Sequence, residues 1–556
     1  MWLFDIFKDK KEAVSVIEKP FVNNGYNVRA DFMPGAGLYR SLFSVLWNGE
    51  KNLGEIGPIK SYVPDYEALR LRSWQAYLDS EIAQTIINKK NRWTIGRGLK
   101  LQAEPNVVVL KSEKIKLDVE NFSEIAEARF TVFAKSRFSS FSKMSNLNTL
   151  ASKAYLNSIV GGDVLVIMRF IDNNLTVQLI DGSMVCSPSF GDEYYPQALA
   201  NGNKILNGIE MNDSGEHIAY YVRKANAMPI IAVDRIEAKN SLGYTTSFLV
   251  YGLEYRLNNV RGLPLIAAVL ETLKKLERYK EATVGSAEER QKISYFIQHE
   301  SSSTGESPLA KQIAKAYDTT SLGFNDEIPK DVNGNALADT VAVSTNKQVF
   351  NMPVGSELKS LESKAELHFK DFYGVNTDIV CAAVDIPPNV AMSKYDSNFS
   401  ASRAALKDWE HTLTVDRQRF AFQFMQPIYN FWLYIEILKN NIQAPGYLKA
   451  LDEGNLMVIE SYTNARFVGS NVPHIDPEKE VRAERLKLGL TGASIPLTTV
   501  EAATESLNEG DSDANMAQYA LELEESKKLK IEVPIAPAAV PPMKEKKKGK
   551  TKPPKD

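Results

Sequence analysis

The sequence predicts an α+β body followed by unusually long helices, and three observations support this fold class. Within the first 260 residues, helical patterns precede a series of short β-rich runs separated by turn residues. Helical periodicity then dominates from residue 261 to residue 438. A small segment rich in Ser, Thr, Asn and Gly, residues 300–354, interrupts this helical region. Such a chain would carry a helical hairpin with a decorated tip on a mixed body.

The length and charge of the chain limit the classes of function that it can have. Its 556 residues are enough for roughly two to four domains with a sizeable core. The formal net charge of −3 gives no global positive field that would hold nucleic acid tightly. This argues against a tight, sequence-reading DNA-binding protein, and it is compatible with a protein along which DNA slides.

The cysteines and the apolar runs predict a soluble protein of a reducing compartment. Cys186 and Cys381 are too few and too far apart to build a disulfide framework or a zinc site, so we expect both to be buried and reduced. The longest apolar run, residues 159–171, is interrupted by glycines and charges and is shorter than the roughly 18 to 20 residues that span a bilayer. The first residues show no secretory signal pattern, and no membrane partner is expected.

Periodicity and turn residues define the elements of the body. After an irregular stretch to about residue 60, a helix is predicted over 65–93, and the glycines of residues 96–98 end it. Residues 172–174 have the composition of a hairpin turn between two strands. The other predicted elements are helices over 123–136 and 146–159 and strands over 163–170, 175–180, 218–223, 230–233 and 245–251.

Long helices characterise the second half. A helix from Pro264 to about His299 would extend about 50 Å at about 1.5 Å per residue, and Gly285–Ser286 would kink or break it. A second very long helix, from Ser400 to about Leu438, contains Pro427, which predicts a bend. The remaining parts are a strand over 340–343, a helix over 355–373, a break at 385–389, a polar loop over 391–400, a helical module over 476–530 and a disordered, basic tail over 533–556.

No pattern in the sequence points to a reaction. The chain has neither a phosphate-binding Gly-rich loop ending in Lys-Ser/Thr nor a Gly-x-Ser-x-Gly nucleophile elbow. The five histidines are scattered without the spacing of a metal site. Acidic clusters such as Glu288–Glu289 are most simply solvated helix faces. We therefore predict no catalytic residues, no metal and no cofactor.

Several segments resemble the lambda-type portal protein family of tailed phages, in the order in which that family presents them. The segment 261–264, Arg-Gly-Leu-Pro, is similar to the start of the family's stem helix. The segment 399–405, Phe-Ser-Ala-Ser-Arg-Ala-Ala, resembles the family's Tyr-Ser-Ser-Ala-Arg-Ala-Ala, with Phe in place of Tyr and the second Ser displaced. The other similar segments are 69–73, 96–102, 219–223, 426–433 and 475–480. The resemblance covers about residues 65 to 505.

The resemblance implies a portal-type subunit with an α+β wing, a long helical stem hairpin, a small α/β clip, a long kinked helix and a helical C-terminal crown. The implied divisions are 1–260 for the wing, 261–299 for stem helix 1, 300–354 for the clip, 355–388 for stem helix 2, 389–402 for the tunnel loop, 403–475 for the long helix and the return to the wing, 476–532 for the crown and 533–556 for a disordered Lys/Pro tail.

The function implied by the resemblance is that of a non-enzymatic ring subunit, usually dodecameric, at the unique vertex of the capsid. The ring would form the channel for packaging and ejecting double-stranded DNA. It would dock the terminase large subunit first and the head-completion or adaptor protein afterwards, and it would contact the major capsid protein and the scaffold. The protein would be made in the host bacterial cytoplasm and would end in the virion.

The resemblance also singles out candidate site residues. The tunnel loop, with Ser393, Lys394, Tyr395, Ser397 and Asn398, would approach DNA, Lys394 through transient phosphate contact and the polar residues through hydrogen bonds. A plain solvated loop is the alternative. Arg403 is a candidate for an inter-subunit ion pair, with an ordinary surface arginine as the alternative. For the lysine tail, with seven lysines against two acids over 544–556, we favour a solubilising role over contact with DNA or scaffold.

Two rival functions remain at this stage. An enzyme such as a terminase or a capsid-processing nuclease would need a phosphate loop or a positioned set of carboxylates, and the sequence shows neither. Another phage head structural or adaptor subunit, without a DNA channel, would not need two helices that bracket a small polar insert.

Overall fold

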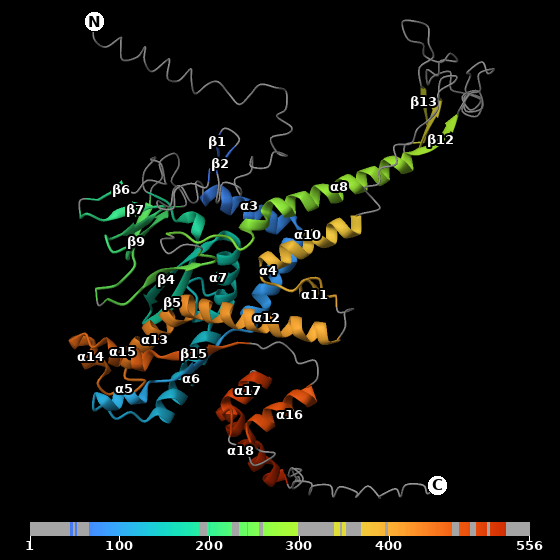
Figure 1. The fold of residues 1–556 in the computed structure, drawn as a ribbon. Helices are drawn as coiled ribbons and strands as arrows, with labels where there is room; N and C mark the ends of the chain where they lie inside the picture. The colour runs from blue at the N-terminus through green and yellow to red at the C-terminus, as the bar shows by residue number, and fades with distance from the viewer. Residues whose placement is uncertain are drawn as a thin grey trace, which may run out of the picture. The chain divides into compact units, whose positions relative to one another are not determined.

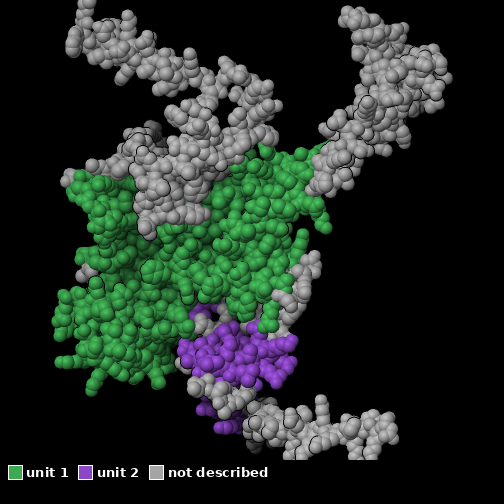
Figure 2. Space-filling model, in the orientation of Figure 1, with its two compact units in different colours: residues 1–467 green, residues 468–556 purple. Residues whose placement is uncertain are grey.

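The computed structural model divides the chain into two compact units, residues 1–467 and residues 468–556, coloured green and purple in Figure 2. The structure describes residues 45–47, 50–52, 66–187, 197–199, 201–224, 233–241, 243–254, 260–297, 339–344, 347–351, 369–394, 399–469, 477–489, 496–508 and 512–529. Most of the first 65 residues, most of the insert and the C-terminal tail therefore lie outside the description.

Helices α3, α4 and α7 pack together as the helical part of the first unit (Figure 1). Where one helix over 65–93 was predicted, the structure has two, because the chain leaves helical geometry at Ser80 (φ −94°, ψ 118°). The predicted helices over 123–136 and 146–159 are confirmed, with bounds that differ by one to four residues. The helices are α3 (Tyr66–Asp79), α4 (Glu81–Thr94), α5 (Val107–Ser112), α6 (Val119–Lys135) and α7 (Leu147–Gly161).

A three-stranded antiparallel sheet, in the order β11-β4-β5, follows α7. Its strands are β4 (Asp163–Ile171), β5 (Asn174–Asp181) and β11 (Ser247–Tyr251). The predicted hairpin turn is confirmed. Ile171 pairs with Asn174, and Asp172 and Asn173 between them have φ of 50° and 61°. Asp and Asn tolerate this left-handed conformation better than other non-glycine residues, and two-residue hairpin loops require it.

A second sheet of five antiparallel strands, in the order β10-β9-β8-β7-β6, completes the β-rich part of the body. The predicted strand over 218–223 is confirmed as β9. The strand predicted over 230–233 is only partly described, since β10 begins at Val233 and residues 225–232 lie outside the description. The strands are β6 (Gln197–Ala198), β7 (Lys204–Leu206), β8 (Ile209–Met211), β9 (His217–Arg223) and β10 (Val233–Glu237).

A long helix, α8 (Leu270–Lys292), leaves the body after the 3₁₀ turn η4 (Ala267–Val269). It runs through Gly285–Ser286 without a break. Its 23 residues correspond to about 35 Å, shorter than predicted. The prediction of helix as far as His299 was wrong, because residues Ile293–Ile297 form strand β12. We call α8 and its partner helix α10 (Phe369–Ala383) the strut.

The insert between the two strut helices contains a small sheet in the order β12-β14-β13. Strand β13 (Asp339–Ser344) confirms the strand predicted over 340–343, and it pairs antiparallel with β14 (Lys347–Asn351). Strand β12 pairs parallel with β14, so residues assigned by prediction to stem helix 1 belong to the sheet of the insert. In Figure 1, β12 continues α8 at the end away from the body.

The second very long helix begins as α12 (Phe399–Phe420), passes through a π-helical turn (Ala421–Met425) and continues as α13 (Gln426–Leu438). Pro427 lies in the first turn of α13, where its missing N–H costs least. The π-helical turn also contacts the three-stranded sheet, because the Oε1 atom of Gln423 accepts a hydrogen bond of 3.0 Å from the backbone N–H of Tyr251 in β11. Helix α12 starts inside residues 389–402, so the loop predicted there is shorter than expected.

The remaining elements end the first unit and make up the second. In the first unit these are β1 (Val45–Trp47), β2 (Glu50–Asn52), β3 (Lys100–Ala103), α11 (Pro388–Ala391), α14 (Tyr447–Glu453), α15 (Leu456–Thr463) and β15 (Ala465–Val468), whose last residue belongs to the second unit. The described part of the second unit is otherwise helical, as predicted for 476–530: α16 (Pro477–Lys487), α17 (Val500–Asn508) and α18 (Ser512–Leu529).

Candidate functional site

A buried arginine fixes the start of the strut to the body. The Arg261 side chain is 2% exposed, and its Nε and Nη2 donate to the two carboxylate oxygens of Asp163 over 2.7 and 2.8 Å. Its remaining N–H groups donate to backbone carbonyl oxygens at 2.6 to 3.0 Å, those of Gly182, Val185 and Asn207. All five donors of the guanidinium are thereby used. Nine residues beyond Arg261, the strut helix α8 begins.

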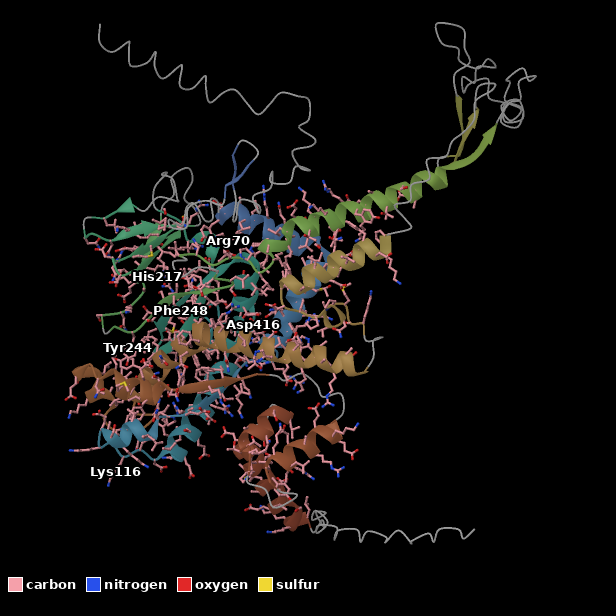
Figure 3. All side chains as sticks on the ribbon, viewed as in Figure 1. Arg70, Lys116, His217, Tyr244, Phe248 and Asp416 are labelled. Carbon is pink, nitrogen blue, oxygen red and sulfur yellow. The ribbon has the colours of Figure 1, made fainter. Side chains whose placement is uncertain are left out.

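A second buried arginine, from α3, joins the same carboxylate. Arg70, labelled in Figure 3, donates from Nη2 to Asp163 Oδ1 over 2.8 Å and from Nε to the carbonyl oxygen of Gly161 over 2.7 Å. Burial alone would raise the pKa of Asp163, but the guanidinium groups of Arg261 and Arg70 outweigh it and hold the pKa below its usual value. Asp163 therefore ties α3, β4 and the start of the strut together as a charged, fully hydrogen-bonded centre.

Two glycines allow the backbones to meet at this centre. A Cβ on Gly262 would lie 2.0 Å from the carbonyl oxygen of Gly162, and a Cβ on Gly162 would lie 2.5 Å from that of Gly262. Gly162 also has φ of +97°, which side-chain-bearing residues rarely adopt. Because both contacts are with backbone atoms, neither position can hold a larger residue without moving the start of the strut.

Aromatic rings hold the two strut helices side by side. Tyr279 of α8 stacks on Phe369 of α10, with ring centroids 5.6 Å apart and planes 11° from parallel. The same ring contacts Phe372 at 4.5 Å, and Phe369 stacks in turn on Tyr373 at 5.5 Å. Such pairs contribute about 0.5 to 1.5 kcal/mol beyond their buried area. The hairpin geometry predicted for the segments that flank the insert is therefore present where they are described.

Two lysines of the strut form ion pairs with glutamates. Lys275 lies 3.1 Å from Glu271 one turn earlier, and Lys280 lies 2.9 Å from Glu81 at the start of α4. The Glu81 carboxylate raises the pKa of Lys280 through this contact. The surface of α8 thus alternates in sign rather than presenting a positive stripe.

The predicted DNA-approaching loop follows α11, and the structure describes only its first part. Ser393 and Lys394 are exposed, and Ser393 has φ of 53°. Tyr395, Ser397 and Asn398 lie outside the described residues. The DNA-approaching role of all five therefore stays a prediction.

A lysine that the sequence reasoning did not single out holds the described part of this loop. Lys89 of α4 donates from Nζ to the Ser393 hydroxyl at 2.6 Å and also to the carbonyl oxygen of Val390. Partial burial lowers the pKa of Lys89. The loop therefore starts from a fixed point on α4.

The same helix α4 anchors the long helix that follows the loop. Lys90 pairs with Asp416 of α12 over 2.8 Å, and its Nζ also lies 5.8 Å from the ring centroid of Trp409 (Asp416 is labelled in Figure 3). Arg417 donates to the carbonyl oxygens of Thr94 and Trp93 at the C-terminal end of α4, over 3.1 and 3.2 Å. Both flanks of the loop thus rest on α4.

Arg403, the candidate for an inter-subunit ion pair, lies half-buried near the start of α12. Nothing in a single chain tests contact with another copy, so this role remains a prediction. Both cysteines are free and buried, as predicted.

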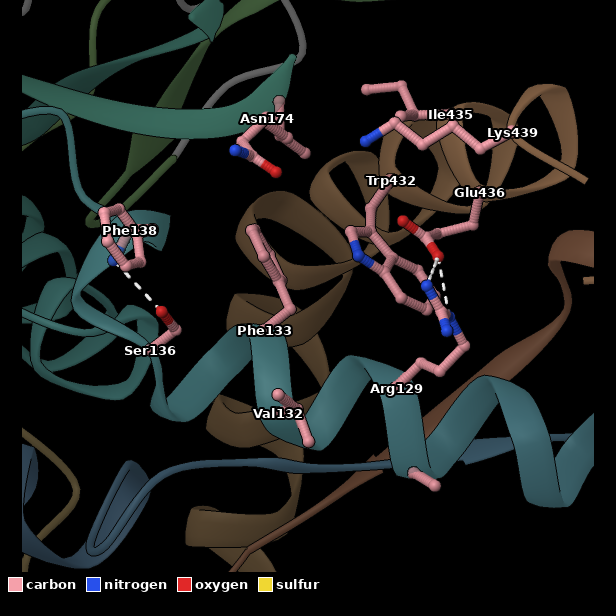
Figure 4. A pocket seen from close by; sticks show the side chains of 12 residues that line it. Arg129, Val132, Phe133, Ser136, Phe138, Asn174, Trp432, Ile435, Glu436 and Lys439 are labelled. Atoms are coloured by element: carbon pink, nitrogen blue, oxygen red, sulfur yellow. Dashed lines mark hydrogen bonds and ion pairs between the residues drawn. The ribbon is translucent and has the colours of Figure 1, made fainter. Parts of the chain in front are cut away.

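A cavity of about 440 Å³ lies between α6, η2 (Arg137–Ser139) and α13 (Figure 4). Trp432 and Phe133 stack in its wall, with centroids 6.2 Å apart. Arg129 pairs with Glu436 over 2.6 Å, and Glu436 also accepts from the Asn441 amide at 3.0 Å. These contacts tie α6 to α13, and we assign the cavity a structural role.

The described residues contain neither a metal-binding cluster nor a membrane-spanning helix. No cluster of three His, Cys, Asp or Glu side chains suited to a metal ion occurs among them. Within the same residues, each helix is too short or too polar to cross a membrane.

The sequence contained signals for the residues that were missed. Arg70 and Arg261 both stand in segments that resemble the portal family, yet their burial was not predicted. Lys89 and Lys90 follow the apolar residues Ile86 and Ile87 of α4 at a spacing of three residues, which places them on the same side of the helix. A lysine on the apolar side of an amphipathic helix needs a partner, and this was the available signal.

The chain is similar to chains in two solved particle structures. The chain is similar to a chain in the neck of an empty gene transfer agent particle, with 7% identity, a TM-score of 0.39, and 78% of this chain and 92% of that chain covered. It is similar to a chain of the virion of a native gene transfer agent particle, with 8% identity, a TM-score of 0.38 and the same coverage. No curated protein matches the sequence. The family model described as "Phage portal protein, lambda family" matches residues 54–417, more than half of the chain, and the chain therefore belongs to the lambda family of phage portal proteins.

Proposed function

We propose that this chain is the subunit of a portal ring at one vertex of a phage-type capsid. The ring forms the channel through which double-stranded DNA is packaged and later ejected. The observation that carries the proposal is that a chain of the portal family has the strut. Its helices α8 and α10 stack through Tyr279 and Phe369, and the start of α8 is fixed to the body at Asp163. The portal family is a structural, non-enzymatic family.

Rotational repetition of the strut provides the wall of the channel. Copies placed around an axis line the pore with charges of both signs, because Lys275 and Lys280 of α8 are paired with Glu271 and Glu81. Strong phosphate contacts would slow the DNA, since each neutralised phosphate adds to affinity. Paired charges on the strut and a net charge of −3 for the chain suit a surface that DNA passes without being held.

The loop between α11 and α12 provides the closest approach to DNA. Lys394 is exposed directly after the point where Lys89 holds Ser393. A cation on a short segment with a fixed base can touch a phosphate briefly while the rest of the loop follows the duplex. The same role extends to Tyr395, Ser397 and Asn398.

The insert, residues 300–354, is the docking site for the terminase large subunit during packaging and for the head-completion or adaptor protein afterwards. The position of the insert supports this docking role, because β12 carries the chain from the end of α8 directly into the sheet of the insert. Free energy for DNA movement comes from the terminase. The major capsid protein and the scaffold are the further partners, in a ring of twelve copies as is usual for the family.

Negative-stain electron microscopy of the purified full-length protein tests the proposal. We expect closed rings with a central hole, together with a mass that is an integral multiple of the subunit mass. Shells, sheets or monomers under all assembly conditions would instead favour another head structural or adaptor subunit and would overturn the proposal.

A further inference from the structure

Three exposed phenylalanines lie beside the β4–β5 hairpin. Phe170 belongs to β4, and Phe141 donates its backbone N–H to the carbonyl oxygen of Val177 in β5 over 3.0 Å. Phe138, Phe141 and Phe170 are 63%, 43% and 53% exposed. A cation lies 5.3 to 5.8 Å from the centroid of each ring, and these cations are Lys143, Arg169 and Lys439 in the same order. Exposed apolar side chains are ordinary when they are isolated, but a group of aromatic rings indicates a surface that a partner covers.

Contacts join these residues into one surface. The Nζ of Lys439 donates to the carbonyl oxygen of Asn173 in the hairpin turn at 2.6 Å, and the Nζ of Lys143 lies 3.8 Å from the Asp172 carboxylate. The cavity of about 440 Å³ between α6, η2 and α13 borders the same residues, because Phe138 and Lys439 line it. We call residues 132–143, 169–173 and Lys439 the hairpin surface.

Beyond the structural role of its walls, the cavity gives this surface an exposed apolar rim. Val132 and Phe138 line the cavity, and Val132 is 71% exposed on α6. Phe133 and Trp432 stand behind them in the wall (Figure 4). All twelve residues that line the cavity belong to the described part of the chain. The volume lies within the range of about 300 to 1,000 Å³ typical of binding pockets, so the cavity can accept a bulky apolar side chain.

The hairpin surface and its immediate neighbours carry an excess of positive charge. Residues 128–144, 169–175 and 432–441 contain six Lys or Arg residues and two acids, Asp172 and Glu436. Both acids already have a cation within 4 Å, since Glu436 pairs with Arg129 and Asp172 lies near Lys143. The other four cations form no ion pair within the described residues, and they are Lys135, Arg137, Arg169 and Lys439. The surface therefore favours a partner of negative charge.

We propose that the hairpin surface binds an acidic segment of another protein that carries a bulky apolar side chain. The apolar side chain contacts Val132 and Phe138 at the rim of the cavity, and carboxylates of the segment pair with the four cations. An apolar anchor in a pocket surrounded by polar contacts is the usual arrangement of a specific protein interface. The inference goes beyond the proposed ring function and does not depend on it, because all the residues of this surface belong to one chain.

Exposed apolar area distinguishes a protein partner from duplex DNA at this surface. DNA would satisfy the four cations through its phosphates. Its backbone has no apolar side chain to cover Val132 and the three phenylalanines, so these residues would stay exposed. An acidic protein segment with an apolar anchor satisfies both parts of the surface.

Selection from a random library of twelve-residue peptides, with the purified full-length protein as the target, tests the chemistry of the partner. The library is first depleted on the variant Lys135→Glu with Arg137→Glu, so that the peptides carried forward need the hairpin surface. Both side chains are exposed and unpaired within the described residues, so this variant should fold like the parent. We expect the selected peptides to have net negative charge and at least one bulky apolar residue. Depletion on Lys111→Glu with Lys116→Glu, an equal change of charge at exposed lysines of α5 and the turn after it, should leave these peptides in the library.

Fluorescence anisotropy of a labelled selected peptide measures the apolar contribution. Val132→Asn should raise the Kd about fivefold or more, because it removes the apolar rim of the cavity. Val108→Asn is the matched control, because Val108 is 79% exposed on helix α5, and this variant should bind the peptide like the parent.

Several outcomes would overturn the inference. Selected peptides without net negative charge, or equal affinities of the Val132→Asn and Val108→Asn variants, would exclude an acidic segment with an apolar anchor. Binding of a 30-base-pair duplex that is lost with Lys135→Glu and Arg137→Glu, without any selected peptide, would assign the surface to DNA. Loss of rings in that variant alone would assign it to a contact between copies. A parent protein that selects acidic peptides but forms no rings would overturn the ring function and leave this inference intact.

Discussion

Asp163 and Arg261 are joined by two hydrogen bonds, of 2.7 and 2.8 Å, although 98 residues separate them in the sequence. Asp163 begins the central strand of the three-stranded sheet, and Arg261 precedes the strut. The direction in which the strut leaves the body is therefore set by a carboxylate held between two guanidinium groups. Substitution of any of these charged residues is strongly destabilising, because removing one partner of a buried ion pair leaves the other charge without compensation.

Asp163→Asn is expected to lower the free energy of unfolding by about 3 to 5 kcal/mol, since it leaves Arg70 and Arg261 buried without a counter-charge. Urea unfolding followed by circular dichroism measures this loss. Asp213→Asn is the control. Asp213 pairs with Lys204 at 3.6 Å on the surface, with 86% of its side chain exposed, and its loss should be barely measurable. Equal stabilities of the two variants would contradict the role assigned to Asp163.

Glu210 is expected to make the five-stranded sheet sensitive to acid. Hydrogen bonds from Arg235 and Asn203 lower the pKa of Glu210 to about 2, against the effect of burial. A carboxyl whose pKa is lower in the folded chain stabilises it above the unfolded pKa of about 4.3 and loses this contribution as the pH falls toward 2. Glu210→Gln should cost about 1 to 2 kcal/mol at pH 7, after allowance for solvent screening, and much less near pH 2. Urea titrations at both pH values check this, and a pH-independent difference would argue against it.

The thiol of Cys381 is expected to be unreactive in the folded chain. Burial, reinforced by Asp378, raises the pKa of Cys381 to about 11, so very little thiolate exists at pH 8. Iodoacetamide should label the unfolded chain at two sites and the native chain at neither. Ser393→Cys, at an exposed position, should add one fast-reacting site. Labelling of native Cys381 at the rate of a free thiol would show that α10 does not pack on the body as described.

Lys89→Met is expected to release the start of the loop without disturbing the ring. It removes two hydrogen bonds from a charged donor, each of which contributes about 1.5 kcal/mol or more, so amide exchange at residues 390–394 should rise about tenfold or more. Lys111→Met, at an exposed lysine of α5, serves as the control. In a packaging reaction, Lys89→Met rings should package less DNA than Lys111→Met rings. Unchanged exchange at residues 390–394 would contradict the anchoring role of Lys89.

Local pattern was enough to predict most elements of the body. The β4–β5 hairpin follows from two apolar runs around Asp172–Asn173, and helices α6 and α7 follow from their apolar periodicity. The end of α8 was missed because residues 293–297 are apolar and aromatic, a composition that fits either a helix or a strand. These residues form a strand because they pair with β14, which lies more than fifty residues later in the chain. Such a long-range choice is not visible in a local pattern.

The charged centre at Asp163 could not be predicted from local sequence pattern either. The segments around Arg70 and Arg261 could be noticed as similar to a family, but burial of both with Asp163 depends on a fold that brings three distant segments together. Periodicity cannot predict this. The anchoring of both flanks of the loop by Lys89 and Lys90 is equally a product of tertiary packing, although two lysines beside the apolar face of α4 were a usable hint.

An electron cryomicroscopy reconstruction of the isolated oligomer tests the central claim most directly, because it measures where residues 270–292 and 369–383 lie relative to the symmetry axis. The account predicts a closed ring in which these two helices from every copy surround a pore wide enough for duplex DNA, with Lys394 facing the pore. A ring whose pore is lined by other segments, with α8 and α10 at its outer edge, would contradict it.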